Sequence, residues 1–488
     1  MNVITPLSSI AHTSCGLGAF SSTRTEPSGS AKEYALHRGS APVLILLVLS
    51  FLSLLLCSFS AAKAAPPVAA PAAPEVTTLA NGVRLVSLYE PASSQVVIDV
   101  FFRVGVNDEA GDAGITGLIT RAWFADAHWR SVTQLQRDLG LAGSGIGSLF
   151  GGDFAEIWTV SGTADDDVQR AAQALLLNLV ASPGLDSTAL AKAKEEQTRI
   201  LALERDNPLE LTLNRLRARL WAVSPQGRPL LGTPETIAAI SPAAVQTYYV
   251  RLFRPSRTVI VVAGNIRSER AHALVEANLG AAGWVEGGRP AAPDRLPALE
   301  TVPPGLRDVA VPRPAPASVL ALGYLAPGTT RAAADWPALL VLDTVLGGGK
   351  TSRLFRLRDS GALIGYDVRT LLVPSQVQSL WAAYVIGNGV PAEIRAALQK
   401  ELTALASGER PVTDNEIARA KVFLKGQHAV GRQLLKARTY EAGWAETMGL
   451  GAAFGTEYES RIDTVTTAQV QRLAQQIFRA NGAAVYTR

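Results

Sequence analysis

A run of glycines followed by lysine and threonine is the first stretch of this sequence that suggests chemistry. In VLGGGKTSRLF, at 345–355, the Gly-Lys-Thr resembles the end of a phosphate-binding loop, whose backbone amides surround nucleotide phosphates. Such a loop leaves a strand and needs an earlier glycine at the position of Thr344. The preceding residues instead have apolar side chains at helical spacing. The sequence therefore predicts a turn between two helices, with Lys350 and Arg353 on solvated helix surfaces.

Histidine and cysteine, the residues that metal chemistry most often uses, are scarce. Cys15 and Cys57 both lie in the first 64 residues, so the remainder has no disulfide and no thiolate metal site. Three histidines follow, His128, His272 and His428, and no two of them are closer than 144 residues. A zinc site built from two histidines on adjacent turns of one helix is therefore excluded.

The first 64 residues have the features of an export leader. His37 and Arg38 precede an apolar run at 41–62, and small residues follow it, which is the order of a secretory signal peptide. The same run is just long enough to span a bilayer, so an uncleaved membrane anchor is the alternative. An Ala/Pro-rich spacer at 65–75 follows the leader.

Length and composition restrict the rest of the chain. A chain of 488 residues is too long for one ordinary hydrophobic core. Hydrophobic residues make up 48% and charged residues 18%, which excludes a disordered chain and a polytopic membrane protein. The formal net charge of +4 is small and scattered, which argues against a nucleic-acid partner.

Two halves of similar plan follow the spacer. Residues 240–264 resemble residues 465–487, and Val245 and Phe253 match Val470 and Phe478 at a constant offset of 225 residues. Each copy predicts a capped amphipathic helix, a break and an apolar strand.

Strands and long helices do not alternate strictly, which favours an α+β fold. We expect two homologous α/β-sandwich domains, each a mixed, largely antiparallel sheet packed with helices, facing each other across a cleft. The expected N-terminal domain covers 76–282, a Pro/Gly-rich linker covers 283–308, and the C-terminal domain covers 309–488.

An ordered set of segments across 76–488 resembles the M16 peptidase family, which includes insulinase, pitrilysin and mitochondrial processing peptidase. The segments include LANGVRLV, VIDVFFRVGVNDEAGDAGITGL, LLGTPETIAAISPAAVQTYY and LGGGKTSRLFRLRDSGALIGYDV. Active members carry His-x-x-Glu-His on the first helix after the acidic loop. The histidines bind zinc, and the glutamate takes a proton from the metal-bound water.

The resemblance places Gly117 and Arg121 where the histidines belong, and Thr120 where the general base belongs. Glycine offers no ligand atom, threonine is no base at neutral pH, and arginine brings a fixed positive charge. The third ligand falls near Glu195 and Glu196, which otherwise belong to a solvated helix face. We therefore expect no catalytic residue and no metal in this chain. Arg121 is expected to fill the vacated space and pair with one of these glutamates.

Substrate contacts are assigned by the resemblance to the second half. They are a glycine loop, here Gly347, Gly348 and Gly349, and an arginine and a tyrosine, which fall on Arg358 and Tyr366. The arginine needs a one-residue shift in the following loop to match the family spacing. A tyrosine hydroxyl and a guanidinium can hold a peptide carbonyl and stabilise an oxyanion.

These features predict an exported M16-like protein in the periplasm of a Gram-negative bacterium, with membrane contact only through an uncleaved leader. The resemblance implies a heterodimer in which a zinc-bearing M16 subunit supplies the metal and base, while this chain binds a peptide or unfolded protein. Alone, the chain is expected to be inactive. The alternative is a peptide-binding or structural scaffold protein of the cell envelope without peptidase activity.

Overall fold

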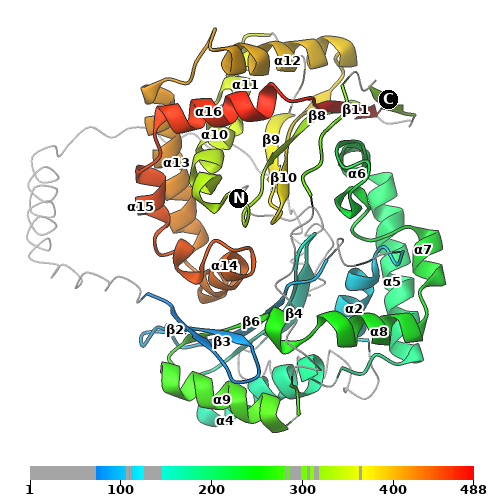
Figure 1. Cartoon of the computed structure of the whole chain (residues 1–488), viewed down its shortest axis with the longest axis vertical. Helices are drawn as coiled ribbons and strands as arrows, with labels where there is room; N and C mark the ends of the chain where they lie inside the picture. The colour runs from blue at the N-terminus through cyan, green and yellow to red at the C-terminus, as the bar shows by residue number, and fades with distance from the viewer. Residues whose placement is uncertain are drawn as a thin grey trace, which may run out of the picture. The chain divides into compact units, whose positions relative to one another are not determined.

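The computed structural model describes residues 73–105, 109, 111–125, 145–181, 183–281, 283–285, 298–304, 308–312, 318–361, 365 and 367–487 (Figure 1). The expected leader at 1–64, the spacer up to residue 72 and most of the expected linker at 283–308 lie outside these residues. Within the described ranges, no helix combines the length and the apolar character that crossing a bilayer requires.

The first half builds a sheet whose described strands have the order β1-β2-β6-β3-β5-β4. The strands are β1 Glu75–Thr78, β2 Arg84–Tyr89, β3 Val96–Phe102, β4 Gly145–Phe150, β5 Ala155–Ser161 and β6 Thr258–Gly264. The helices are α2 Ile115–Ala122, α4 Asp165–Ala172, the π-helix η1 Gln173–Ala181, α5 Ser187–Asp206, α6 Pro208–Leu220, α7 Pro234–Ala239, α8 Pro242–Leu252 and α9 Ser268–Ala281, with 3₁₀ turns η2 Pro225–Gly227 and η3 Pro255–Arg257.

The second half builds a sheet whose described strands have the order β7-β11-β8-β10-β9. The strands are β7 Val309–Val311, β8 Ser318–Pro327, β9 Asp367–Val373, β10 Gln378–Gly387 and β11 Ala483–Thr487. The helices are α10 Trp336–Gly347, α11 Arg353–Asp359, α12 Pro391–Ser407, α13 Asp414–Gly431, α14 Leu435–Thr447, α15 Tyr458–Asp463 and α16 Thr467–Phe478, with 3₁₀ turns η4 Ala333–Asp335 and η5 Ala452–Phe454.

The two sheets repeat one pairing pattern, which confirms the predicted α+β fold of two similar units. In the first sheet β2 pairs parallel with β6, and β6-β3-β5-β4 pair antiparallel. In the second sheet β7 pairs parallel with β11, and β11-β8-β10-β9 pair antiparallel. The repeated segments become α8 with β6 and α16 with β11. Val245 and Phe253 are buried, as are their counterparts Val470 and Phe478.

Each half contributes one helix to the sheet of the other half. Helix α6 packs on β8 and β11, and α14 packs on β3 and β6 (Figure 1). Glycines permit both close approaches. A Cβ on Gly323 in β8 would lie 2.7 Å from a methyl carbon of Leu216, and a Cβ on Gly443 in α14 would lie 2.3 Å from the ring of Phe101. The core is therefore shared between the halves, so neither sheet buries its apolar faces with its own helices alone.

Helix α14 also carries charged residues that bind the first half. The Nζ of Lys436 lies 2.8 Å from a carboxylate oxygen of Asp99 and 2.5 Å from one of Glu156. Further ion pairs join Arg438 to Glu90 and Arg84 to Glu446. Polar and apolar contacts thus join the halves along one helix.

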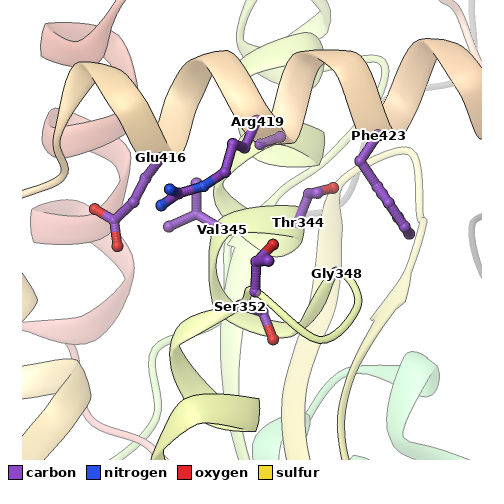
Figure 2. Close-up of a pocket in the computed structure, with 9 residues that line it drawn as sticks. Thr344, Val345, Gly348, Ser352, Glu416, Arg419 and Phe423 are labelled. Carbon is purple, nitrogen blue, oxygen red and sulfur yellow. The ribbon is translucent and has the colours of Figure 1, made fainter.

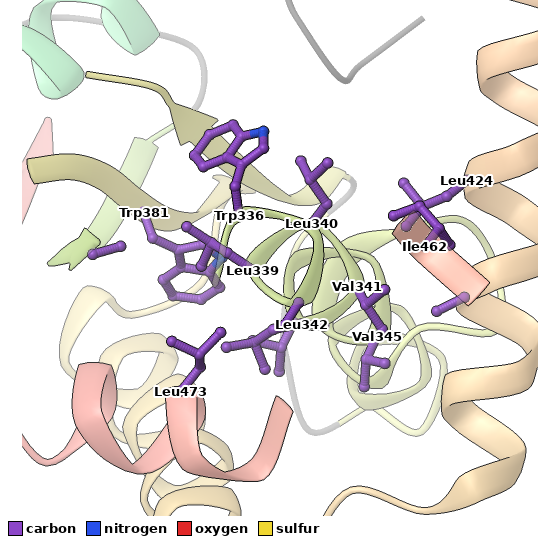
Figure 3. Close-up of a cluster of buried hydrophobic side chains, with 14 of the residues drawn as sticks. Trp336, Leu339, Leu340, Val341, Leu342, Val345, Trp381, Leu424, Ile462 and Leu473 are labelled. Atoms are coloured by element: carbon purple, nitrogen blue, oxygen red, sulfur yellow. The ribbon is translucent and has the colours of Figure 1, made fainter. Parts of the chain in front are cut away.

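Helix α10 is buried along nearly its whole length and fixes the position of the glycine run that ends it. Its side chains from Trp336 to Leu346 are buried except Asp343. They pack against Trp381, Leu424, Ile462 and Leu473, which belong to β10, α13, α15 and α16 (Figure 3). The prediction that this run ends a helix rather than a strand is confirmed.

Candidate functional site

Helix α2 carries Gly117, Thr120 and Arg121, the residues that the resemblance predicts at the zinc-motif positions. Its N-cap residue, Gly114, has φ 93°, in the left-handed region that favours glycine. The carboxylate of Glu109 accepts hydrogen bonds from the backbone N–H of Gly114 at 3.0 Å and of Thr116 at 3.3 Å. A buried carboxylate thereby satisfies two amides at the start of the helix.

Polar side chains of α2 bind the helix itself. The hydroxyl of Thr120 donates to the backbone carbonyl of Gly117 at 2.9 Å. Arg121 Nη1 donates to the same carbonyl at 2.8 Å and to Gln197 Oε1 at 3.1 Å, and its guanidinium lies over the ring of Phe150. Burial lowers the pKa of Arg121 to about 10, although the charges of Glu196 and Glu204 raise it. Arg121 therefore lies against α5, as expected, but its hydrogen-bond partner there is the amide of Gln197 rather than a glutamate.

Gln197, not Glu195 or Glu196, is the residue of α5 that faces the motif. Gln197 is fully buried, and its Nε2 donates to the carbonyls of Gly114 at 3.0 Å and Leu231 at 2.9 Å. Glu195 is exposed, and Glu196 pairs with the exposed Arg199. Both positions agree with the prediction that these glutamates belong to a solvated helix face. The sequence contained a signal for Gln197, because it continues the spacing of the buried residues Ala189 and Ala193 along the helix.

The residues at this position do not fit zinc. Structural and catalytic zinc sites use thiolate, imidazole or carboxylate ligands, whereas here glycine, an arginine cation and a hydrogen-bonded amide meet. A Cβ on Gly117 would lie 2.9 Å from the Phe150 ring and 3.0 Å from Gln197 Oε1, so a histidine there needs its neighbours to move. Among the described residues, no three His, Cys, Asp or Glu side chains are grouped so that they could hold a metal ion.

The Glu109→Gln variant is expected to flatten the pH dependence of stability. Burial raises the pKa of Glu109 from 4.5 to about 7, despite the amide hydrogen bonds that lower it. Because the folded protein binds this proton more tightly, the stabilisation is complete below the unfolded pKa and is lost as the pH rises through the folded pKa. Between these two pKa values, the free energy of unfolding falls by at most ~1.4 kcal/mol per pH unit.

Urea unfolding between pH 4.5 and about pH 8 measures this effect. Glu75→Gln, at an exposed position in β1, serves as the matched control. Equal slopes for Glu109→Gln and wild type would contradict the assignment.

The glycine run lies in a tight turn between α10 and α11. Gly349 has φ 75°. A Cβ on Gly347 would lie 2.1 Å from Thr370 Oγ1, and one on Gly348 would lie 2.5 Å from the methyl of Thr344. The amide of Gly348 donates to Thr344 and that of Gly349 to Gly347, so these two amides are used within the turn rather than exposed. Packing and backbone conformation therefore account for all three glycines.

The prediction that Arg353 lies on a solvated helix surface is wrong, because Arg353 is only 8% exposed. Its Nε and Nη2 donate to the two carboxylate oxygens of Glu416 at 2.9 and 2.8 Å, and its Nη1 lies 3.4 Å from Glu401 Oε1. It also donates to the backbone carbonyls of Arg410 and Pro411. A bidentate pair with further backbone bonds ties α11 to α13 and holds the glycine turn between them.

The expected pair Arg358 and Tyr366 is described only in part. Arg358 lies at the end of α11, half-buried, where its Nη2 binds the Asp359 carboxylate at 2.8 Å and its guanidinium lies 4.0 Å from the centre of the Phe355 ring. Tyr366 lies outside the described residues. The two assignments stay predictions.

A pocket of about 260 Å³, measured with its open mouth, adjoins the glycine turn. It lies between the turn and α13, and Figure 2 shows Arg419 and Phe423 extending from α13 toward the turn. Its lining residues are Thr344, Val345, Gly348, Thr351, Ser352, Glu416, Arg419, Ala420 and Phe423. Sequence analysis identified the turn but missed the α13 wall, because the two are separated by more than sixty residues.

Known proteins resemble this chain in sequence and in fold. The family model described as "Peptidase M16 inactive domain" matches residues 239–423. An uncharacterized zinc protease of Mycobacterium tuberculosis is 28% identical over 86% of this chain and 94% of its own length. A Bacillus subtilis protein of the same description is 22% identical over 82% of this chain and 95% of its own length.

Two crystal structures share the fold at 18% identity. A protease from Helicobacter pylori has a TM-score of 0.75 and covers 86% of this chain and 99% of its own. A peptidase M16 inactive domain from Pseudomonas fluorescens also has a TM-score of 0.75, and it covers 85% and 98%.

The paired sheets and the match to the inactive-domain model indicate a metallopeptidase homologue of two similar units. The chain is similar to the peptidase M16 family, whose inactive-domain model matches residues 239–423. The family-model match begins downstream of Gly117, Thr120 and Arg121, so the assignment of these residues to the zinc-motif positions stays a prediction.

Proposed function

We propose that this protein is the non-catalytic, substrate-binding subunit of a heterodimeric metalloendopeptidase. A partner subunit with His-x-x-Glu-His supplies the zinc and the general base. The observation that carries the proposal is the hydrogen-bonded Arg121–Gln197 pair at the position of the motif. In this proposal the chain keeps the glycine turn of the family but has lost its zinc ligands.

Substrate binding is assigned to the glycine turn, Arg358 and Tyr366. The ion pair of Arg358 joins it to an exposed neighbour, Asp359, whose side chain is 55% exposed. Exposed pairs of this kind contribute little free energy, typically ~0–1 kcal/mol. The pair with Asp359 is therefore a weak competitor for a peptide carbonyl. The name zinc protease, given to relatives that align over most of their length, supports the peptidase context.

The apolar leader supports export to the periplasm of a Gram-negative bacterium, with the chain released by cleavage or held at the inner membrane by residues 41–62. The partner, substrate and compartment belong to one proposal, because a periplasmic heterodimer needs both chains to be exported.

The test is to purify the chain alone and together with an exported M16 subunit that has the intact motif. Cleavage of unstructured peptides is expected in the mixture and absent from the chain alone. The Arg358→Ala/Tyr366→Phe double variant is expected to lower kcat/KM of the mixture by the equivalent of ~2–4 kcal/mol. Arg472→Ala, which removes another arginine from a surface ion pair, serves as the matched control.

Stoichiometric zinc together with cleavage by the chain alone would contradict the proposal. An unchanged kcat/KM in the double variant would show that Arg358 and Tyr366 do not contact the substrate. Peptide binding with no cleavage in any pairing would favour the peptide-binding alternative, and no peptide binding at all would favour a scaffold.

A further inference from the structure

The pocket beside the glycine turn presents a cation that the fold itself does not use. Arg419 lines the pocket from α13 and is exposed. Within the described ranges it takes part in no hydrogen bond or ion pair. Lys350, in the turn next to the pocket, is likewise exposed and unpaired among these residues. Unpaired cations beside a concave surface attract an anionic group.

A buried hydroxyl on the same lining also lacks a partner. Ser352 is 3% exposed, and its Oγ makes no hydrogen bond. Buried polar atoms are nearly always hydrogen-bonded in folded proteins, so an unpaired one calls for an explanation. A ligand oxygen entering the pocket would accept the hydrogen of this hydroxyl.

The carboxylate in the pocket wall does not oppose an anion. Glu416 accepts hydrogen bonds from Arg353, Arg356 and Thr413. Burial raises the pKa of Glu416, but the hydrogen bonds from Arg353 and Thr413 outweigh it and lower the pKa to about 2. The lone pairs of this carboxylate are therefore occupied and its charge is compensated.

Cations outnumber carboxylates around the turn. The two carboxylates of the network, Glu401 and Glu416, pair with three cations, Arg353, Arg356 and Arg410, and Arg419 adds a fourth cation in the pocket lining. The local field is positive, and low-dielectric walls strengthen it.

Apolar side chains continue the surface away from this charge. Phe423 lines the pocket and is 38% exposed, and its neighbour Val422 is 69% exposed. Val345 forms another part of the lining. The site thus offers a cation and a hydroxyl donor at one place and apolar contact beside it.

We propose that this pocket binds a carboxylate of a peptide, through Arg419 and Ser352, with apolar peptide residues against Phe423. The inference rests on the proposed substrate-binding function and narrows it to peptides that place a carboxylate next to apolar residues. The carboxylate is supplied either by an acidic side chain or by a free C-terminus.

Fluorescence anisotropy with the isolated chain tests the proposal. Three labelled peptides share one apolar sequence: one has an internal Glu and an amidated end, one has Gln and a free end, and one has Gln and an amidated end. The first or the second is expected to bind at least tenfold more tightly than the third. Arg419→Gln and Ser352→Ala are expected to remove that preference. Lys400→Gln removes an exposed lysine from α12 and is expected to preserve it.

The outcomes separate this inference from the function on which it rests. Equal binding of all three peptides would overturn the carboxylate pocket and leave a peptide-binding subunit. A preference that Arg419→Gln and Lys400→Gln reduce equally would also overturn it. Binding of none of the peptides would overturn both proposals.

Discussion

Replacing Lys436 by methionine is expected to lower the free energy of unfolding by ~3–5 kcal/mol at neutral pH, as breaking a buried ion pair usually does. The lysine comes from α14, and its two partners, Asp99 and Glu156, come from β3 and β5 of the first half. Both carboxylates are almost fully buried. Methionine fills much of the volume but leaves both carboxylates without their cation.

The strand register brings the two carboxylates together. Asp99 pairs with Trp158 and Phe101 pairs with Glu156 on the antiparallel strands, so Asp99 and Glu156 are diagonal neighbours on the face that α14 covers. Asp99 Oδ1 and the hydroxyl of Tyr440, also on α14, have no hydrogen-bond partner. One ammonium therefore pairs with two buried carboxylates at the contact between the halves.

The loss in Lys436→Met is expected to shrink as the pH falls. Burial raises the pKa of Asp99 and of Glu156 above the ordinary values, and the charge of Asp99 raises that of Glu156 further, while Lys436 lowers both. Groups with raised folded pKa values stabilise the fold below their unfolded pKa values and lose that contribution as the pH rises. Without Lys436 both pKa values rise further, so the stability of the variant falls more steeply above about pH 4.5.

Denaturant unfolding of Lys436→Met, of Arg438→Met and of an Asp99→Asn/Glu156→Gln/Lys436→Met triple variant measures this. Arg438 also joins α14 to the first half, but its pair with Glu90 is less buried, so its loss is expected to be smaller. The triple variant is expected to recover most of the stability, because no charge stays buried. A Lys436→Met variant as stable as wild type at pH 7 would contradict the account.

Adding one methyl group at Gly443 is expected to destabilise the contact between α14 and the first sheet. In Gly443→Ala the new Cβ would lie 2.3 Å from Phe101 Cε2 and 2.9 Å from Val261 Cγ2. Forcing extra volume into a packed core typically costs ~1–3 kcal/mol. That cost is expected to exceed the up to ~1 kcal/mol that replacing glycine by alanine in a helix usually gains.

Gly426→Ala is the matched control, because Gly426 lies in α13 and a Cβ there has no neighbour within 4 Å. This variant is expected to be more stable than wild type by about 0.5–1 kcal/mol. The two alanine variants should therefore shift the denaturation midpoint in opposite directions. A shift of Gly443→Ala in the same direction as Gly426→Ala would show that α14 does not pack this closely on β3 and β6.

The sequence was sufficient to predict many of the helices and strands and to indicate the resemblance to the M16 family. Apolar periodicity and capping residues located α8 and α16, and the constant offset between Val245 and Val470 predicted that they belong to repeated units. The glycine run was correctly assigned to a turn after a helix, because Thr344 and the helical spacing before it are local features. The predicted zinc-motif positions are likewise local, since Gly117, Thr120 and Arg121 lie within two turns of one helix.

The assignment of Arg353 failed for a physical reason. An arginine at the start of a short polar helix is usually solvated, and nothing nearby in sequence supplies its partner. Glu416 lies 63 residues away, and only the packing of α11 against α13 brings the two side chains together. Gln197 was missed because the two preceding glutamates, Glu195 and Glu196, have the carboxylates that commonly bind zinc, whereas Gln197 has an amide.

By itself, the sequence determined the helices and strands of the two-unit α+β plan and the glycine turn, because each of these elements depends on residues close together in the chain. Only the tertiary structure decided which residue of α5 meets Arg121, which partner buries Arg353, and where the α13 pocket lies. It also decided that α6 and α14 each pack on the other half's sheet. These features depend on contacts between distant segments. The spacing of residues along one helix or strand predicts which face is buried, but not which distant segment packs on that face.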